Sequence, residues 1–437
     1  MSKSNYEWDF NNPPPVSRHT LHKHHVYEEY ISRYLETVVP HQGEYVRISI
    51  VDGFCGGGIY NFVEKGEICF GSPVRIIETV RATASKLNAI RTKPLKFLVN
   101  YYFVDKEQKA IDCLKRVFSE LGIYEEDGES FHIWHGTFVE EYPKIRQSIR
   151  AKISTKRLDQ KVIFVLDQYA YRQVPFSITN KIMSDFTKAE ILLTFVPRAF
   201  LDYAGKNSQQ ALETTNQQLM RLGLEVSITD IREKAEAFSD PSCIYLHAEQ
   251  LFLQEAIARV IQDQTIARHF SKYFIQSSNS SRDLWIIHLA NHYKAHDVMI
   301  SVQWESANSD YYHPGYLGLP PAILGFDSSK SDLTQQMNFG MKHFDHSGES
   351  RTLALLSDQL PNLLFDQYGK SVTVGDLFER ITNDTTCNIE LLKKALQASL
   401  DRGDIRLSSQ KSSNHRIATA APDSAVIQIV QRSIILL

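Results

Sequence analysis

One stretch, Val46 to Tyr60 (VRISIVDGFCGGGIY), constrains this chain more than any other. Its β-branched apolar run ends on Asp52, and three consecutive glycines at 56–58 follow within six residues. Because glycine lacks a Cβ atom, such a turn can adopt positive φ and bring its backbone close to a ligand. A buried strand followed by a glycine-rich turn is how an α/β fold binds a nucleotide-like ligand. A plain tight turn between strand and helix explains the glycines equally well, so other parts of the chain must decide.

The whole chain has the composition of an ordinary globular protein of two or three domains: 437 residues, 43% hydrophobic and 23% charged. Its net charge of −3 gives no global basic field, so any nucleic-acid contact would need a local patch. We expect a cytoplasmic protein without a membrane span, since no apolar run approaches ~18 residues and the polar start MSKSNYEWDFNNPPP lacks a signal-peptide core. The five scattered cysteines, with no CxxC, indicate a reducing compartment and no structural zinc.

The N-terminal segment, 1–45, is predicted to be a proline-marked lead-in followed by a helix over 17–39. Four histidines surround Lys23 on this helix: His19, His22, His24 and His25. No carboxylate or cysteine completes a metal-ligand set with them. A solvated or substrate-facing basic helix end therefore explains the cluster better, and we predict no metal.

Two further apolar runs end on an aspartate, as the first one does. The run 97–104 ends on Asp105, and the run 162–166 ends on Asp167. With short strands at 131–134 and 191–196 and helices between them, the pattern predicts a Rossmann-like, doubly wound, mostly parallel sheet. The carboxyl ends of parallel strands share one edge, so the three carboxylates should gather there. Asp105 also fits an N-cap of the helix at 107–121, and the two roles are compatible.

The remaining segments are predicted more coarsely. We expect a small-residue loop at 66–73, a helical insertion at about 207–274, and a last strand at 283–289 within a domain spanning 46–305. The insertion would form a lid or a substrate platform, or would simply pack. Residues 306–370 are expected to be loop or linker.

Residues 371–437 are predicted to form a winged-helix-like domain, with a helix, a second helix at 388–402, and a two-stranded wing. Such domains bind nucleic acid, and they also serve as dimerisation or protein-docking modules. The side chains available for phosphate contacts are Lys393, Lys394, Arg402, Arg406, Lys411 and Arg416.

Taken together, the blocks DGFCGGGIY, GSP, VDKE, HGTF and LDQYAY resemble the three-Cys-motif partner (TcmP) family, over roughly residues 17–305. That family is similar to class I S-adenosylmethionine-dependent methyltransferases with a Rossmann-like fold. The stretch WIIHLANHYKAHDVMISVQW resembles the family's final strand and helix.

The resemblance implies S-adenosylmethionine as cofactor and a role for each matched residue. Asp52, Phe54, Gly56 and Gly58 would hold its methionine end. Asp105 would bind the ribose, and Thr137 or Phe138 would lie beside the adenine. Asp167 would face the methyl group, with Tyr169 as an aromatic that could stack on a flipped base. The prolines common beside such an aspartate in base and amide N-methyltransferases are replaced by Gln168 and Tyr169.

Three functions follow from these observations. The first is methyl transfer to a nitrogen of a nucleic acid or protein, with Asp167 orienting the acceptor. The second is a non-catalytic scaffold or partner protein in a bacterial nucleic-acid modification or phage-defence system, which the missing prolines favour. The third is phosphoryl transfer with Mg²⁺ on Asp52, Asp105 and Asp167, which leaves the glycines unexplained. The absence of GxxxxGK[ST] disfavours a P-loop enzyme.

Overall fold

The computed structural model describes residues 6–41, 43–152, 161–168, 173–196, 208–237, 248–275, 284–306, 346–368, 371–409, 412–415 and 417–430. The chain divides into two compact units, Met1–Ala295 and His296–Leu437. Among the described residues, no helix is long and apolar enough to cross a membrane.

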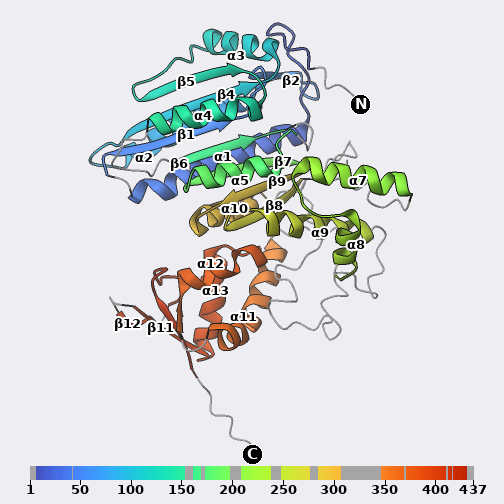
Figure 1. The fold of residues 1–437 in the computed structure, drawn as a ribbon. Coiled ribbons are helices and arrows are strands. Elements are labelled where there is room, and N and C mark those ends of the chain that lie inside the picture. The colour runs from blue at the N-terminus through green and yellow to red at the C-terminus, as the bar shows by residue number, and fades with distance from the viewer. Residues whose placement is uncertain are drawn as a thin grey trace, which may run out of the picture. The chain divides into compact units, whose positions relative to one another are not determined.

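A seven-stranded sheet forms the centre of the first unit (Figure 1). Across the sheet its strands are β5 (Glu129–His135), β4 (Lys96–Asp105), β1 (Tyr45–Asp52), β6 (Lys161–Leu166), β7 (Ala189–Phe195), β9 (Leu284–Ala290) and β8 (His269–Ile275). The first five are parallel, and β9 is antiparallel to both of its neighbours. Strand β7 is buried along its whole length, which is typical of a parallel strand covered on both faces. The predicted doubly wound, mostly parallel α/β sheet is therefore confirmed.

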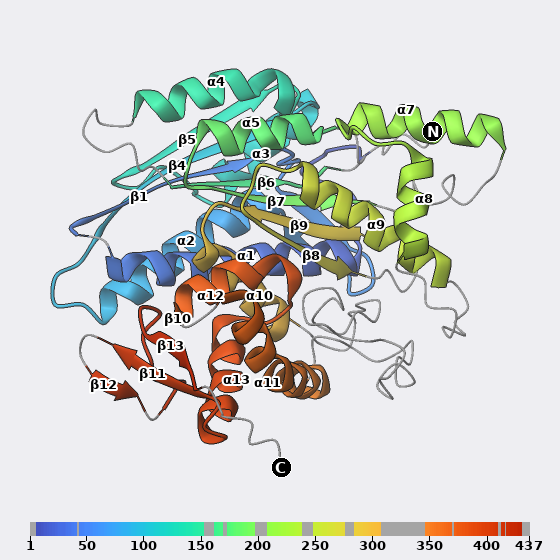
Figure 2. The ribbon, with the colours of Figure 1, turned by 60° about the horizontal axis from the view of Figure 1, so that its bottom comes forward.

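Helices cover both faces of this sheet. Helices α1 (Arg18–Val38) and α2 (Ser72–Ala89) lie on one face, and α4 (Phe138–Ala151) and α5 (Phe176–Asp185) lie on the other (Figure 2). The other helices of the first unit are α3 (Gln108–Glu120), α7 (Gln209–Leu222), α8 (Ile228–Ala237) and α9 (Ala248–Gln264), with a 3₁₀ turn at Val39–His41. Pro73 stands in the first turn of α2, where its missing N–H costs no helical hydrogen bond.

Two expectations for this unit are wrong in detail. The small-residue loop after the glycines is part of a β-hairpin, β2 (Ile59–Phe62) paired with β3 (Glu67–Phe70). The segment expected to be helical up to residue 274 instead leaves α9 at Gln264 and forms β8. Strand β8 (HFSKYFI) lacks a strict apolar–polar alternation, so its aromatic and apolar residues fit the helical pattern of the segment before it.

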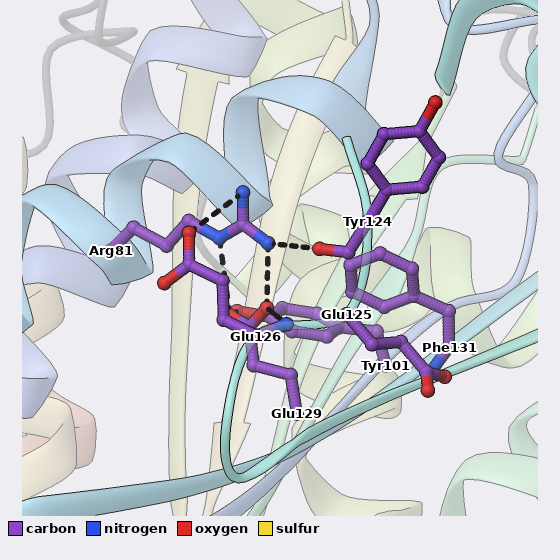
Figure 3. A network of polar contacts seen from close by, with 7 residues as sticks. All are labelled: Arg81, Tyr101, Tyr124, Glu125, Glu126, Glu129 and Phe131. Carbon is purple, nitrogen blue, oxygen red and sulfur yellow. Dashed lines mark hydrogen bonds and ion pairs between the residues drawn. The ribbon is translucent and has the colours of Figure 1, made fainter. Parts of the chain in front are cut away.

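A polar cluster ties α2 to the loop before β5 (Figure 3). The Arg81 guanidinium donates to both carboxylate oxygens of Glu129, at 3.3 and 2.7 Å, and to the Tyr124 carbonyl at 2.6 Å. The Tyr101 hydroxyl donates to Glu129 at 3.3 Å, and Glu126 lies 3.3 Å from Arg81. The Glu129 side chain is only 7% exposed, so this cluster fixes a nearly buried charge at the amino end of β5.

The second unit is helical with a small antiparallel sheet in the order β10-β13-β11-β12. Helix α10 (Tyr293–Glu305) leads into it, and its elements are α11 (His346–Tyr368), β10 (Ser371–Thr373), α12 (Val374–Ile381), a 3₁₀ turn at Thr382–Asp384, α13 (Ile389–Asp401), β11 (Ile405–Ser409), β12 (Ser412–His415) and β13 (Val426–Ile429). Helix α11 lies within the stretch expected to be linker, which corrects that expectation for residues 346–368.

Candidate functional site

Three carboxylates end three adjacent strands of the sheet. Asp52 closes β1, which lies between β4 and β6, whose ends carry Asp105 and Asp167. The chain adds β4 and β5 on one side of β1 and β6 and β7 on the other, so the strand order reverses here. The crevice outside the carboxyl ends at such a reversal is where open α/β sheets bind ligands. The predicted gathering of the three aspartates at one sheet edge is thus what the strand pairing produces.

Asp52 is completely buried. Its Oδ1 accepts a 3.1 Å hydrogen bond from the Phe54 N–H, and its Oδ2 has no hydrogen-bond partner among the described residues. Burial raises the pKa of Asp52 to about 7, and the charges of Asp167 and Asp105 add to that rise, whereas the nearby Ser72 hydroxyl and the Phe54 N–H oppose it. The site therefore contains a carboxyl group that titrates near neutral pH.

The glycine loop is joined to the end of β4. The Gly56 N–H donates to Asp105 Oδ2 at 3.0 Å, and the Glu107 N–H donates to Asp105 Oδ1 at 2.8 Å. Gly56 (φ 59°) and Gly58 (φ 75°) both adopt the left-handed conformation that glycine tolerates best. Desolvation raises the pKa of Asp105, against the two backbone hydrogen bonds. Asp105 thus orders the loop and still keeps lone pairs for a further donor.

An aromatic segment before α1 lies against this loop, a contact that the sequence pattern does not predict. A Cβ atom on Gly57 would lie 2.4 Å from the Trp8 indole, and one on Gly56 would lie 2.8 Å from it. Pro15 and Asn61 form a parallel bridge that ties the same segment to β2. Close approach at Gly56 and Gly57 is therefore required by a tryptophan of this chain, whatever ligand the loop binds.

Tyr60 lies between Trp8 and the carboxylates of the site. Its ring lies 5.2 Å from Trp8 and 6.2 Å from His24, between ring centroids. Its hydroxyl is 3.3 Å from the position of a Cβ on Gly56. Desolvation, together with nearby charges that include all three aspartates, raises the pKa of Tyr60 well above its usual value. The hydroxyl is therefore a neutral hydrogen-bonding group at the wall of the site.

Asp167 is paired with a lysine from α1. Lys23 Nζ lies 2.5 Å from Asp167 Oδ1, and the two side chains are 9% and 14% exposed. Burial alone would raise the pKa of Asp167, but the contact with Lys23 lowers it below its usual value. Neighbouring His24 is neutral, since burial and Lys23 lower its pKa to about 3. The expected basic end of α1 thus includes a largely buried ion pair at the site.

The residues after Asp167 are described only in part. Gln168 is 2% exposed, and its Oε1 accepts hydrogen bonds from the N–H groups of Gln173 (3.0 Å) and Val174 (2.9 Å). Its Nε2 has no hydrogen-bond partner among the described residues. Tyr169, predicted to be catalytic, lies outside the described residues.

The two residues predicted beside the adenine lie in different environments. Thr137 is exposed and caps α4 through a capping box with Glu140. Phe138 is 1% exposed, its ring packs 6.5 Å from that of Phe54, and it touches the position of a Cβ on Gly53. Thr137 is therefore accessible to a ligand, whereas Phe138 packs against the loop that follows β1.

No group of three or more His, Cys, Asp or Glu residues able to hold a metal ion occurs within the part of the chain that the structure describes. In particular, Asp167 forms an ion pair with Lys23, and both carboxylate oxygens of Asp105 accept hydrogen bonds from backbone N–H groups.

Of the six basic residues expected to contact phosphates in the second unit, four are described, and three of these form ion pairs within that unit. Lys393 lies 3.0 Å from Asp423, Lys394 lies 3.0 Å from Glu349, and Arg402 lies 2.9 Å from Asp404. Arg406 is exposed on β11. The remaining two, Lys411 and Arg416, lie outside the described residues.

No known family model matches this sequence, and no curated protein matches it. Among solved structures, the bifunctional kinase-methyltransferase WbdD is 9% identical, with a TM-score of 0.29 over 62% of this chain and 39% of that one. A DUF574 family protein from Streptomyces avermitilis is 10% identical, with a TM-score of 0.27 over 61% and 83%. Magnesium protoporphyrin IX methyltransferase from Synechocystis PCC 6803, with bound SAH, is 12% identical, with a TM-score of 0.25 over 64% and 90%. The chain thus spans about two fifths of the length of the first of these, and all three likenesses are too distant to assign a family or an activity.

Proposed function

We propose that this chain binds S-adenosylmethionine at the glycine loop and transfers its methyl group to an acceptor at the carboxyl end of β6. The observation that carries the proposal is the hydrogen bond from Gly56 to Asp105. This hydrogen bond holds Asp105, at the end of β4, beside the glycine turn that follows β1. In Rossmann-type sites an acid at this position binds the ribose hydroxyls of a nucleotide.

The residues present fit such a cofactor. Each Asp105 oxygen accepts one backbone N–H, and a carboxylate oxygen has two lone pairs, so each can also accept a ribose hydroxyl. The unpartnered Oδ2 of Asp52 is an acceptor for which an ammonium group, such as that of a methionine moiety, is a suitable donor. Phe54, Gly56 and Gly58 would line the methionine end, and Thr137 would lie beside the base.

The cofactor, when bound, supplies an electrophilic methyl group on a sulfonium. The chain itself has little covalent chemistry to do: it must align the acceptor with that methyl and exclude water. Asp105 and the loop would fix the cofactor, and the Trp8 and Tyr60 rings would shield the loop from solvent. Asp167, held by Lys23, would orient the acceptor.

The narrower predictions from the sequence stay predictions. They are a TcmP relationship, a nitrogen acceptor on nucleic acid or protein, stacking by Tyr169, a winged-helix-like second unit that binds nucleic acid or a protein partner, and a role in modification or phage defence. The order of α11, β10, α12, α13 and a hairpin is in keeping with a winged helix. The internal pairing of Lys393, Lys394 and Arg402 weakens the case for phosphate contacts through these residues.

Calorimetric titration of the full chain with S-adenosylmethionine and S-adenosylhomocysteine tests the proposal. We expect binding in the micromolar range, about −8 kcal/mol, for both ligands. Asp52→Ala should weaken both, since a lost charge-assisted hydrogen bond costs about 1.5–3 kcal/mol. A folded wild-type protein that binds neither ligand would refute the methyltransferase proposal and leave the scaffold function.

A further inference from the structure

Lys23 joins the first helix of the chain to the end of β6. The two paired residues are 144 positions apart in sequence, and their side chains lie 2.5 Å apart with little solvent exposure. A buried ion pair is seldom the most stable arrangement, because the cost of desolvating two charges offsets their attraction. Apolar side chains of similar size would pack there at no such cost. The pair therefore calls for an explanation other than stability.

The pair determines the charge at the position where the acceptor would lie. An unpaired Asp167 would be a lone carboxylate, which attracts amines and stabilises the positive charge that a methylated amine carries. With Lys23 in contact, the pair is neutral overall and presents an ammonium beside the carboxylate. His24 adds no charge, and Gln168 Nε2 is a buried hydrogen-bond donor without a partner among the described residues.

We propose that the Lys23–Asp167 pair selects an oxygen acceptor, either a hydroxyl or a carboxylate, over an amine, in contrast to the nitrogen acceptor predicted from the sequence. This inference rests on the proposed methyl transfer. The ammonium group stabilises negative charge on an acceptor oxygen, and it cancels the attraction that the Asp167 carboxylate would otherwise have for a protonated amine or a cationic methylated product.

The transfer balances in this arrangement. The acceptor oxygen forms a bond to the methyl carbon while the S–CH₃ bond breaks, and the electron pair of that bond stays on sulfur, which becomes a neutral thioether. A hydroxyl proton becomes strongly acidic as the O–CH₃ bond forms, so the Asp167 carboxylate can accept it. A carboxylate acceptor has no proton to lose. Lys23 acts by its charge.

The test compares two ligands that differ at the methyl position. S-Adenosylhomocysteine has a neutral thioether there, whereas sinefungin carries an ammonium group in place of the transferable methyl. The ratio of their affinities, measured by calorimetry on the full chain, reports the charge at the acceptor end without a known substrate. The four proteins are wild type, Lys23→Met, Asp167→Asn and the double variant, with Lys86→Met as control, since Lys86 is a 71% exposed lysine on α2.

We expect Lys23→Met to raise the affinity for sinefungin relative to S-adenosylhomocysteine by about tenfold, because it leaves the carboxylate unpaired. Asp167→Asn should lower the same ratio by about tenfold, because it leaves the ammonium unpaired. The double variant, neutral like the wild type, should return to within about threefold of it, and Lys86→Met should not change it. Asp167→Asn keeps a side-chain oxygen that can accept a hydrogen bond from Lys23. If Lys23→Met does not fold, Asp167→Asn and the double variant are still sufficient for the test. Ratios that move less than threefold in the folded single variants would overturn the inference. Failure of wild type to bind either ligand would instead refute the proposed function.

Discussion

The Gly56 N–H donates a 3.0 Å hydrogen bond to Asp105 Oδ2 and so couples the loop after β1 to the last residue of β4. The two residues are 49 positions apart, with a hairpin and α2 between them. Because the acceptor is a side chain and the donor is backbone, a change at position 105 alters the loop without altering the glycines. This hydrogen bond links the glycine motif directly to the carboxylate that we propose binds the ribose.

The contact of Trp8 with the glycine loop predicts a coupled pair of substitutions. Gly57→Ala should lower the free energy of unfolding by about 1–3 kcal/mol, because its Cβ would lie 2.4 Å from the indole. In a Trp8→Ala background the same change should cost much less, which chemical denaturation of the four proteins would measure. Gly43→Ala, with nothing within 4 Å, is the matched control. Additive effects would show that the indole does not rest on the loop.

Asp52 predicts a stability that depends on pH. Its pKa in the folded chain is raised from 3.8 to about 7, so the fold disfavours the ionised form. Its contribution to stability is fully present below about pH 4, where the carboxyl is neutral in both states, and is lost as pH rises through about 7. Asp52→Asn should therefore hardly change the free energy of unfolding at low pH and should raise it by roughly 2–4 kcal/mol at pH 8. Thermal melts between pH 4 and 8 would measure the difference, with the 88% exposed Asp127 changed to Asn as control. A pH-independent effect of Asp52→Asn would contradict the raised pKa.

The cluster in Figure 3 predicts that Arg81 is needed for stability. Arg81→Met would leave the nearly buried Glu129 carboxylate without its guanidinium partner, at a cost of about 2–4 kcal/mol in the free energy of unfolding. Lys96→Met removes an exposed pair with Asp127 and should cost less than about 0.5 kcal/mol. Urea denaturation of both variants measures the two changes in the free energy of unfolding. Equal changes would mean that the Glu129 carboxylate is solvated and does not need Arg81.

The strands that carry the site could be predicted from sequence because their signal is local. Strand β6 is an uninterrupted apolar run followed by Asp167, and β4 ends on Asp105, so the pattern predicted both strands and the carboxylates at their ends. Strand β8 could not be separated from α9, since its aromatic and apolar residues follow the helix after a four-residue gap.

The partners of the site residues could not be predicted, because they come from distant segments. Nothing near Lys23 in the sequence indicates that it lies 2.5 Å from Asp167. Trp8 stands in a polar, proline-marked lead-in, and its contact with Gly57 depends on how that lead-in crosses the loop. The sequence thus predicted which carboxylates lie together at one edge of the sheet, whereas the neutralisation of Asp167 by Lys23 follows only from the packing of α1 on the sheet.

The most direct test of the cofactor site is the affinity of Asp105→Asn for S-adenosylhomocysteine, measured by calorimetry beside Asp127→Asn. Both changes remove one negative charge, but Asp127 is 88% exposed at the opposite end of the strands. We expect Asp105→Asn to lose about tenfold or more in affinity, roughly 1.5–3 kcal/mol, while Asp127→Asn stays within about twofold of wild type. Equal affinities for both variants and the wild type would show that the ribose is not bound at Asp105, and the proposed cofactor site would be wrong.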